Sequence, residues 1–357
     1  MKYSIIVPVY NRPDEVDELL QSLCEQSLKD FEVVIVEDGS QKDCKEVVGR
    51  YTDRLDVKYF MKPNSGPGQS RNYGAERAQG DYLLVLDSDV VLPTGYLQAV
   101  DDELRRQPAD AFGGPDTAHP SFTDVQKAIS YSMTSFFTTG GIRGGKKKLD
   151  KFYPRSFNMG IRRDVYLQLG GFSKMRFGED IDFSYRIVEA GYQPRLFPSA
   201  WVWHKRRTDF RKFFRQVYNS GIARINLEKR HPGTLKLVHL LPMVFTIGVI
   251  ALVLISAFGR AMMHYDAPNW QSWYWVCALP WLPILFYSLV IFLDSSIRNK
   301  SLKVGLLSVP AAFVQLMGYG FGFIESWWKR CVRKQDEFTA FEKNFYSEEL
   351  IVNSEQL

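Results

Sequence analysis

Three long stretches with almost no charged residues occupy the last third of the chain, and they restrict its fold more than any other feature. They read LVHLLPMVFTIGVIALVLISAFG, YWVCALPWLPILFYSLVIFL and VGLLSVPAAFVQLMGYGFGFI. About 20 apolar residues in a helix cross a bilayer, so each stretch is long enough to do so. Tryptophans such as Trp270 and Trp328 lie where an interfacial belt is expected. A buried helix of a soluble protein would explain one such stretch, but three in succession predict a helical membrane region over residues 236–328.

The three segments differ in ways that predict their behaviour. Pro280 and Pro283 are expected to kink the second segment, and Gly318 with Gly322 offers a small-residue packing face in the third. Basic residues flank the third segment on both sides, and the positive-inside rule places such clusters in the cytosol. We therefore expect two full spans and a third segment, broken by Pro310, that is re-entrant or interfacial. A polar tail follows at residues 329–357.

The first part of the chain alternates apolar, β-branched runs with amphipathic stretches. The runs are SIIVPVY, FEVVIVEDGS, VKYFM and YLLVLDSDV. This rhythm predicts an α/β domain with a mostly parallel, Rossmann-like sheet over residues 1–225, in which ligands bind at the carboxyl ends of the strands. Residues from about 113 to 160 are rich in Gly, Ser, Thr and Lys, and their GGIRGGKKK is expected to be a mobile basic loop.

Composition excludes several classes of protein. A chain of 357 residues with 45% hydrophobic content buries a substantial core and is not disordered. The net charge of +5 is small, so no nucleic-acid partner is expected. The four cysteines form no CxxC pair, which argues against a zinc site and against a disulfide framework. The first apolar run is too short for a signal peptide, so we expect the N-terminal part to stay in the cytosol.

Two carboxylates, Asp87 and Asp89, directly follow the apolar run LLVL. A pair at the end of a strand is a natural site for Mg²⁺ or Mn²⁺, which prefer oxygen ligands and often share them with substrate phosphates. A solvated turn that caps the next helix is the other interpretation, and a single DxD does not exclude it.

Two further acidic pairs occupy comparable places. Glu37 and Asp38 end the run VVIV before Gly39, where a carboxylate can accept hydrogen bonds from a base or a ribose. Glu179 and Asp180 open a predicted helix in GEDIDFSYRI, where the helix dipole alone would also stabilise them. That helix is expected to turn its apolar positions inward: Ile181, Phe183 and Ile187.

The ordered motifs together are far more specific than any one of them. They are SIIVPVYNR, VEDGS, NSGPGQSRNYGAERAQGDYLLVLDSDV, FNMGIRRDVYLQLGGF, GEDIDFSYRIVEAGY and WVWH. In this order the chain resembles a family 2 glycosyltransferase over roughly residues 1–225. The resemblance implies the GT-A fold, a nucleotide-sugar donor and a divalent cation, Mg²⁺ or Mn²⁺.

The resemblance also implies roles for particular residues. Asp180 matches the catalytic base, with Glu179 beside it, and His204 matches a histidine that often completes the metal site with Asp87 and Asp89. The residues implied in nucleotide-sugar binding are Pro8, Tyr10, Glu37, Asp38, Arg71 and Asp87. Lys62, Asn64 and Asn72 are equally compatible with polar lining of the site and with a solvated loop.

Chemistry explains why such a set is needed. A bound cation stabilises the charge on a departing nucleoside diphosphate, while a carboxylate takes the proton of an attacking hydroxyl, so single displacement inverts the anomeric centre. The Gln-x-x-Arg-Trp signature of processive synthases is missing after His204, which favours transfer of one sugar per encounter.

Residues 205–235 are expected to form a basic amphipathic segment next to the membrane. Basic and aromatic residues interleave from Lys205 to Arg215, which is typical of a helix on anionic lipid, although a nucleotide-facing or solvated helix shows the same pattern. We therefore expect an integral protein of the cytoplasmic membrane with a cytosolic catalytic domain, acting on a membrane-associated or lipid-linked acceptor.

Three other functions remain open from the sequence. A polyprenyl-phosphate glycosyltransferase would use an acceptor that needs no deprotonation, so Asp180 would have another role. A membrane scaffold or nucleotide-sugar sensor would not need all acidic motif positions filled, as they are here. A soluble nucleotidyltransferase would explain neither GEDIDF nor the apolar segments.

Overall fold

A computed structural model of the chain describes residues 2–119, 121–139 and 152–342. It has two compact units. The first comprises Met1–Pro120, Lys146–Lys205 and Asp336–Leu357, and the second comprises Ser121–Gly145 and Arg206–Gln335. The segment GGIRGGKKK, expected to be a mobile loop, lies outside the described residues.

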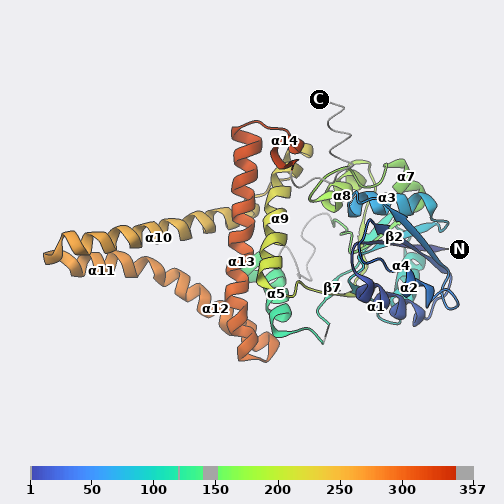
Figure 1. Cartoon of the computed structure of the whole chain (residues 1–357), viewed down its shortest axis with the longest axis horizontal. Coiled ribbons are helices and arrows are strands. Elements are labelled where there is room, and N and C mark those ends of the chain that lie inside the picture. The colour runs from blue at the N-terminus through green and yellow to red at the C-terminus, as the bar shows by residue number, and fades with distance from the viewer. Residues whose placement is uncertain (1, 120, 140–151, 343–357) are drawn as a thin grey trace. The chain divides into compact units, whose positions relative to one another are not determined.

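The first unit is built on a mostly parallel sheet, as the sequence predicted (Figure 1). Over the described residues its strands follow the order β3-β2-β1-β4-β8-β6-β9, with β8 antiparallel to both neighbours. Their bounds are β1 Tyr3–Val9, β2 Phe31–Asp38, β3 Val57–Lys62, β4 Tyr82–Leu86, β6 Ala111–Gly113, β8 Asn158–Arg162 and β9 Arg195–Leu196. The strand order reverses between β1 and β4, and open α/β sheets bind ligands at such a switch point.

Helices cover both faces of this sheet. Side chains alternate along β1, so Ile5 and Val7 pack in one core while Ile6 packs in another. The core around Ile5 includes α1 (Pro13–Cys24), α2 (Lys45–Gly49) and α4 (Tyr96–Arg106). The core around Ile6 includes α3 (Pro67–Arg77), α7 (Arg163–Gln168) and α8 (Glu179–Glu189). Because both faces are covered, the central strands are mostly apolar, with Ser4 of β1 and Glu32 of β2 buried among them as a hydrogen-bonded pair.

A second, three-stranded sheet joins distant parts of the same unit. Its order is β5-β10-β7, formed by Val90–Val91, Val202–His204 and Asp116–Thr117. Strand β10 is antiparallel to β5 and parallel to β7. These strands are only two or three residues long, and each pairs with a segment that is far away in the sequence. The sequence pattern around residue 116 therefore did not predict a strand there.

The second unit is helical. Its helices are α5 Asp124–Thr134, α6 Phe136–Thr139, α9 Phe210–Arg230, α10 Leu241–Tyr265, α11 Trp270–Ala278, α12 Leu282–Asn299 and α13 Leu302–Trp327. Three short helical turns, at Leu237–His239, Ala267–Asn269 and Leu279–Trp281, and a π-helical turn at Trp328–Val332 belong to it as well. Helix α5, in a region expected to be loop-like, begins with a capping box in which Thr123 and Gln126 satisfy each other's backbone N–H groups. A short helix α14, Glu337–Phe341, belongs to the first unit.

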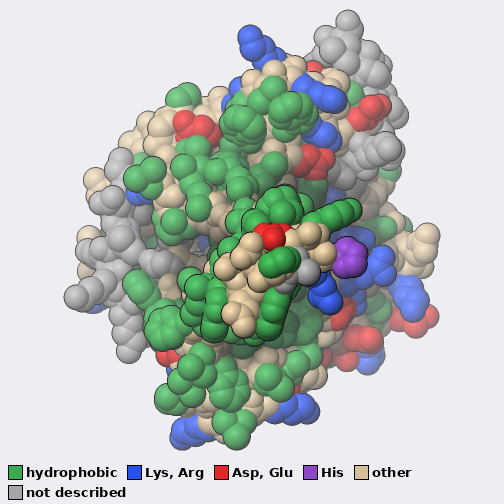
Figure 2. Space-filling model, turned by 90° about the vertical axis from the view of Figure 1, so that its left-hand side faces the viewer, with side chains coloured by type: hydrophobic (Ala, Val, Ile, Leu, Met, Phe, Trp, Pro, Cys, Tyr) green, Lys and Arg blue, Asp and Glu red, His purple; other side chains and the backbone are tan. Residues whose placement is uncertain are grey.

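Helices α10, α11 and α12 form an exposed apolar hairpin. The segments Leu237–Tyr265 and Trp270–Asn299 have mean hydropathies of 2.6 and 2.2, and 6% of each apolar window is buried. The hairpin's exposed apolar side chains include Val253, Leu254, Phe258, Leu285 and Phe286. Figure 2, which looks at the hairpin from its end, shows hydrophobic side chains beside polar ones there. A short 3₁₀ turn, Leu279–Trp281, separates α11 from α12 at Pro280, one of the two prolines where a kink was predicted. Both segments are thus long and apolar enough to cross a membrane.

Helix α13 packs differently, against α9 and α5. Its segment, Leu302–Val332, is also long and apolar enough to cross a membrane, but 44% of its apolar window is buried. The predicted break at Pro310 is wrong, because α13 continues through this residue as one helix. The predicted packing face is confirmed, since a Cβ at Gly318 or Gly322 would lie within 2.6 Å or 2.0 Å of atoms of α9.

Candidate active site

Strand β4 delivers the first two acidic residues to the end of the sheet. Asp87 and Asp89 follow its last residue, and β5 begins directly after them. The Asp89 side chain is 9% exposed and that of Asp87 is 29% exposed. Asp89 therefore lies deeper in the site, while Asp87 remains open to a ligand.

The three-stranded sheet brings His204 to these carboxylates. Residue His204 of β10 pairs with Val90 of β5, directly after Asp89, and the backbone N–H of Lys205 donates to the Asp89 carbonyl at 3.0 Å. Its Nε2 lies 3.2 Å from Asp89 Oδ1 and 4.0 Å from Asp87 Oδ2. The ring of Phe157 stacks on the imidazole at 5.0 Å between centroids, which fixes the plane of the ring.

These three side chains fit a divalent cation. One ligand atom from each of Asp87, Asp89 and His204 lies within 4.8 Å of the others, as the sequence resemblance implied for this set. Two carboxylates and one imidazole suit Mn²⁺ or Mg²⁺ with the remaining positions left for phosphate or water. Burial disfavours a protonated His204, but the carboxylates of Asp116, Asp89 and Asp87 beside its ring outweigh burial and raise its pKa to about 9.

Arginines of the first unit pair with both carboxylates of this cluster. Arg12, which follows β1, contacts the Asp89 carboxylate, and Arg71 of α3 donates to Asp87 at 2.8 Å. Arg71 also donates to Glu179 at 3.1 Å and so links the cluster to the start of α8. The structure therefore connects Asp87, Arg71 and Glu179 in one chain of ion pairs.

The start of α8 places two adjacent carboxylates in different environments. Arg155 donates from Nε to Asp180 Oδ2 at 2.6 Å, and the Ile181 N–H donates to Asp180 Oδ1 at 2.9 Å. Burial raises the pKa of Asp180, but Arg155, together with Arg71 and the Ile181 N–H, outweighs burial and lowers it. For Glu179, burial and the charge of Asp180 raise the pKa. Phe183 and Ile187 are buried as predicted, whereas Ile181 is only partly so.

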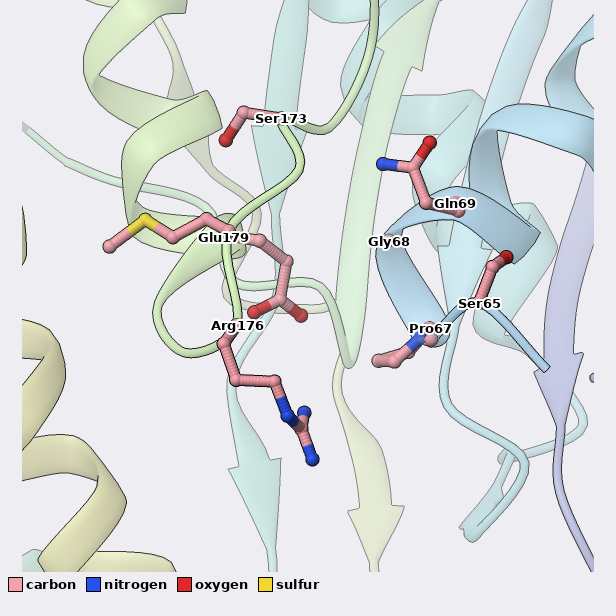
Figure 3. Close-up of a pocket in the computed structure, with 9 residues that line it drawn as sticks. Ser65, Pro67, Gly68, Gln69, Ser173, Arg176 and Glu179 are labelled. Carbon is pink, nitrogen blue, oxygen red and sulfur yellow. The ribbon is translucent and has the colours of Figure 1, made fainter. Parts of the chain in front are cut away.

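A small pocket separates the start of α8 from the start of α3. Figure 3 shows the Glu179 carboxylate pointing into this gap, with the guanidinium of Arg176 below it and Pro67 and Ser65 across from it. Gly68 allows this approach, since a Cβ there would meet the Glu179 side chain at 3.3 Å. The pocket thus combines a helix N-terminus with a guanidinium, and both attract anions.

The acidic pair that ends β2 has internal partners. Asp38 accepts from the backbone N–H groups of Ser65 and Gly66, each at 2.9 Å, and from Lys62 at 2.6 Å. Glu37 is fully buried and accepts from the Cys44 N–H at 3.0 Å and from the Tyr59 hydroxyl at 3.1 Å. In this structure Asp38 shapes the loop before α3, and Glu37 points away from that loop.

The remaining predicted residues lie in varied places. Pro8 is buried in β1, and Tyr10 at its end is 51% exposed. Asn72 fixes the loop before α8 by donating to the Phe172 carbonyl at 2.8 Å. Asn64 approaches Gly39, whose added Cβ would meet the Asn64 N–H nitrogen at 2.7 Å.

Sequence reasoning missed four residues of this site. They are Arg12, Asp116, Arg155 and Phe157. Arg12 had a usable signal, because it follows an apolar strand in the motif SIIVPVYNR. Phe157 begins the motif FNMGIRRDVYLQLGGF, whereas Asp116 and Arg155 lie in segments without a recognisable pattern, and only the fold brings them to the site.

Comparisons with known proteins agree with this architecture. Residues 4–170 match the family described as glycosyl transferase family 2. An uncharacterized glycosyltransferase of Rickettsia felis is 32% identical over 137 residues, which are 38% of this chain and 22% of that protein. A GalNAc(5)-diNAcBac-PP-undecaprenol beta-1,3-glucosyltransferase of Campylobacter jejuni is 33% identical over 115 residues, covering 31% and 37% of the two chains. The match thus spans well under half the length of these relatives.

A solved structure resembles most of the chain in fold. It is a mannosyltransferase from Pyrobaculum calidifontis in complex with GDP-Man and Mn²⁺, with a TM-score of 0.54 and 15% identity over 92% of this chain and 88% of that one. At this identity the likeness concerns the fold, which is of the GT-A type with a helical region after it. Residues 4–170 thus match glycosyl transferase family 2, and the fold of the first unit agrees with that match.

Proposed function

We propose that this chain is an inverting, metal-dependent, non-processive glycosyltransferase that moves one sugar from a nucleotide sugar, with UDP as the nucleotide, to a membrane-associated or lipid-linked acceptor. The observation that carries the proposal is the cluster of Asp87, Asp89 and His204 at the switch point of a family 2 domain. A metal site alone would not identify the reaction. Arg71 pairs with both Asp87 and Glu179, and it thereby links the cluster to the two carboxylates at the start of α8.

The donor half of the site would bind the diphosphate. Asp87, Asp89 and His204 would hold Mg²⁺ or Mn²⁺, which supplies Lewis-acid stabilisation of the leaving diphosphate when bound. Arg71 is buried and pairs with Asp87 and Glu179 through its two Nη atoms, so it would orient Asp87 and add positive charge at the phosphates.

The acceptor half would use Asp180 as general base. An ionised carboxylate can take the proton of an attacking hydroxyl, and Arg155 keeps Asp180 ionised in its buried position. Each carboxylate oxygen has a second lone pair, so the contacts with Arg155 and the Ile181 N–H leave room for the acceptor. Attack from the face opposite the leaving group would invert the anomeric carbon.

The helical unit supports a membrane-associated acceptor. The exposed hairpin would anchor the chain in the cytoplasmic membrane, with the family 2 domain in the cytosol. The Campylobacter relative is named for a substrate that carries undecaprenol, and we extend that class of acceptor to this chain as part of the proposal.

A polyprenyl phosphate is the competing acceptor. Its phosphate is already ionised, so a transferase that uses it does not depend on a general base. The same relative keeps this alternative open, because its named substrate contains a diphosphate-linked polyprenol. The two proposals differ in the bond that joins sugar and lipid, and in the requirement for Asp180.

One experiment tests donor, acceptor and metal together. Purified protein is incubated with a panel of UDP- and GDP-linked sugars and extracted membrane lipids, with Mn²⁺, with Mg²⁺ or with a chelator, and products are identified by mass spectrometry. We expect one UDP-sugar to yield a glycosylated lipid-linked saccharide only when metal is present. Full transfer in chelator would refute the metal requirement, and a product with the sugar on a lipid phosphate would favour the alternative acceptor.

A further inference from the structure

Asp116 lies on the far side of His204 from the two carboxylates of the cluster. Strand β7 begins at Asp116 and pairs with β10, where Val202 is opposite Asp116. The Val202 N–H also donates to the Pro115 carbonyl at 3.1 Å, which fixes the register. Asp116 Oδ2 consequently lies 3.5 Å from His204 Nδ1.

The two nitrogens of His204 therefore face different groups. Nε2 faces Asp89 at 3.2 Å, whereas Nδ1 faces Asp116. Nδ1 is buried and makes no hydrogen bond within the part of the chain that the structure describes. A buried ring nitrogen without a hydrogen bond is costly, and a small shift of either side chain would complete one with Asp116.

We propose that Asp116 is a positioning residue of the metal site, whose carboxylate accepts a hydrogen bond from the Nδ1–H of His204 and thereby leaves Nε2 free to bind the cation. This inference rests on the proposed function. A histidine that binds a metal through one nitrogen commonly donates its other N–H to a carboxylate, which fixes both the tautomer and the ring orientation. The stacked Phe157 restricts the ring plane, and Asp116 sets its rotation within that plane.

Asp116 acts through the ring and is not a fourth ligand in this geometry. Among the described residues, the possible metal ligands that lie within 4.8 Å of one another are Asp87, Asp89 and His204. Asp116 faces the opposite edge of the imidazole, so the two roles predict different behaviour when His204 is removed. A ligand would still contribute to the site, whereas a positioning residue would have nothing to position.

The test measures Mn²⁺ binding by electron paramagnetic resonance on the purified full chain in detergent. Asp116→Ala should weaken Mn²⁺ binding about 10- to 100-fold, as expected for the outer partner of a ligating histidine. Asp116→Asn should fall between this variant and the wild type, because its amide oxygen can still accept the Nδ1–H without a charge. In a His204→Ala background, Asp116→Ala should cause no further loss, since coupled residues are not additive.

Asp110→Ala is the matched control, because Asp110 is a partly exposed carboxylate of the same segment that pairs with Arg162 at 3.1 Å. It should bind Mn²⁺ like the wild type. Thermal unfolding without metal checks the fold of each variant, and Asp116→Asn carries the test if the alanine variant does not fold.

Three results would overturn the inference. Wild-type Mn²⁺ affinity in folded Asp116→Ala and Asp116→Asn would do so, and so would an equal loss with and without His204, which would make Asp116 a ligand. Either result would leave the proposed function intact if the wild type binds Mn²⁺ and transfers sugar. A wild type that binds no Mn²⁺ would overturn both.

Discussion

At the scale of single residues, each carboxylate of the site has a cationic partner from the chain itself. Arg12 contacts Asp89, Arg71 contacts Asp87 and Arg155 contacts Asp180. Several buried carboxylates would otherwise repel one another and be protonated. In spite of burial, the pKa values of Asp89 and Asp180 are lowered, so both stay in the ionised form that would bind a cation or take a proton.

Removing the proposed base should separate chemistry from binding. We expect Asp180→Asn to lower the rate of transfer about 100- to 10,000-fold, the usual contribution of a general base. Binding of UDP should be nearly unchanged, because a base contacts the acceptor more than the donor. Isothermal titration with UDP and a product assay give the two values.

A neighbouring carboxylate provides the control for that substitution. Asp182, on the same helix, is buried and accepts from Ser173 at 2.8 Å and Arg186 at 3.0 Å. Asp182→Asn should lower the unfolding temperature but leave transfer per folded molecule close to the wild type. Wild-type turnover by Asp180→Asn would refute its role as base, and would favour a polyprenyl phosphate acceptor if the product assay agreed.

The partner of Asp180 predicts a pH dependence. Burial alone would raise the pKa of Asp180, and Arg155 lowers it, so the carboxylate stays ionised to lower pH. With Arg155→Gln, burial dominates and the pKa of Asp180 rises. Transfer should then be lost at a higher pH on acidification, which a pH profile of kcat reveals. Arg155→Lys keeps the charge and should restore part of the wild-type profile, while an unchanged acidic limb in Arg155→Gln would exclude this electrostatic role.

Residues of the site differ in how well the sequence predicts them. Asp87 and Asp89 follow a clear apolar strand, and Glu179 and Asp180 open a clear amphipathic helix, so local pattern places them at element ends. Asp116 lies in a two-residue strand and Arg155 in a loop, and they reach the site through pairing and contacts between distant parts of the chain. Local pattern carries no information about such pairings.

At the scale of elements, α9 and α13 form a close parallel pair. Their contacts follow the same chain direction on both helices. A Cβ at Gly322 would meet Tyr218, Ser326 donates to the Ile222 carbonyl, and Arg330 donates to Asn226. Figure 1 shows the two helices side by side. The sequence predicted the glycine face of α13 but not its partner, and it overestimated the effect of Pro310, whose cost the surrounding helices offset.

A larger residue in this contact should separate the pair. A Cβ at Gly322 would lie 2.0 Å from the Tyr218 carbonyl oxygen, which is backbone and cannot turn aside. We expect Gly322→Leu to destabilise the helical unit by about 3 kcal/mol or more, at the upper end of overpacking effects. Thermal unfolding in detergent measures the loss.

The chain supplies a matched control for this substitution. Gly248 of α10 has no atom within 4 Å of an added Cβ, so Gly248→Leu changes the same residue type on another apolar helix without a clash. Its unfolding temperature should stay near that of the wild type. Equal stability of the two variants would show that α9 and α13 do not pack as described.

At the scale of the whole molecule, the helices of the second unit suggest how it meets a bilayer. The hairpin α10–α12 is exposed and apolar, whereas α13 lies along α9, whose exposed residues include Arg211, Lys212 and Arg215. A spanning α13 would carry these cations into hydrocarbon, where each costs about 2.5 to 3.5 kcal/mol. Figure 1 shows the hairpin leaving α13 crosswise, so α13 and α9 can lie in the interface while the hairpin crosses.

This arrangement predicts that the membrane is crossed twice. Both ends of α13 carry basic residues, and two crossings put both ends on the cytosolic side, as the positive-inside rule favours. Cys331, which is exposed just after α13, should therefore be protected from a membrane-impermeant thiol reagent in intact cells once the other cysteines are replaced. The matched reporter is Asn269→Cys at the turn between α10 and α11, in a chain without other cysteines, and it should react from outside.

Labelling of Cys331 only after the membrane is opened supports two crossings. Its labelling in intact cells, with the hairpin reporter also accessible, would place α13 across the membrane and overturn this topology.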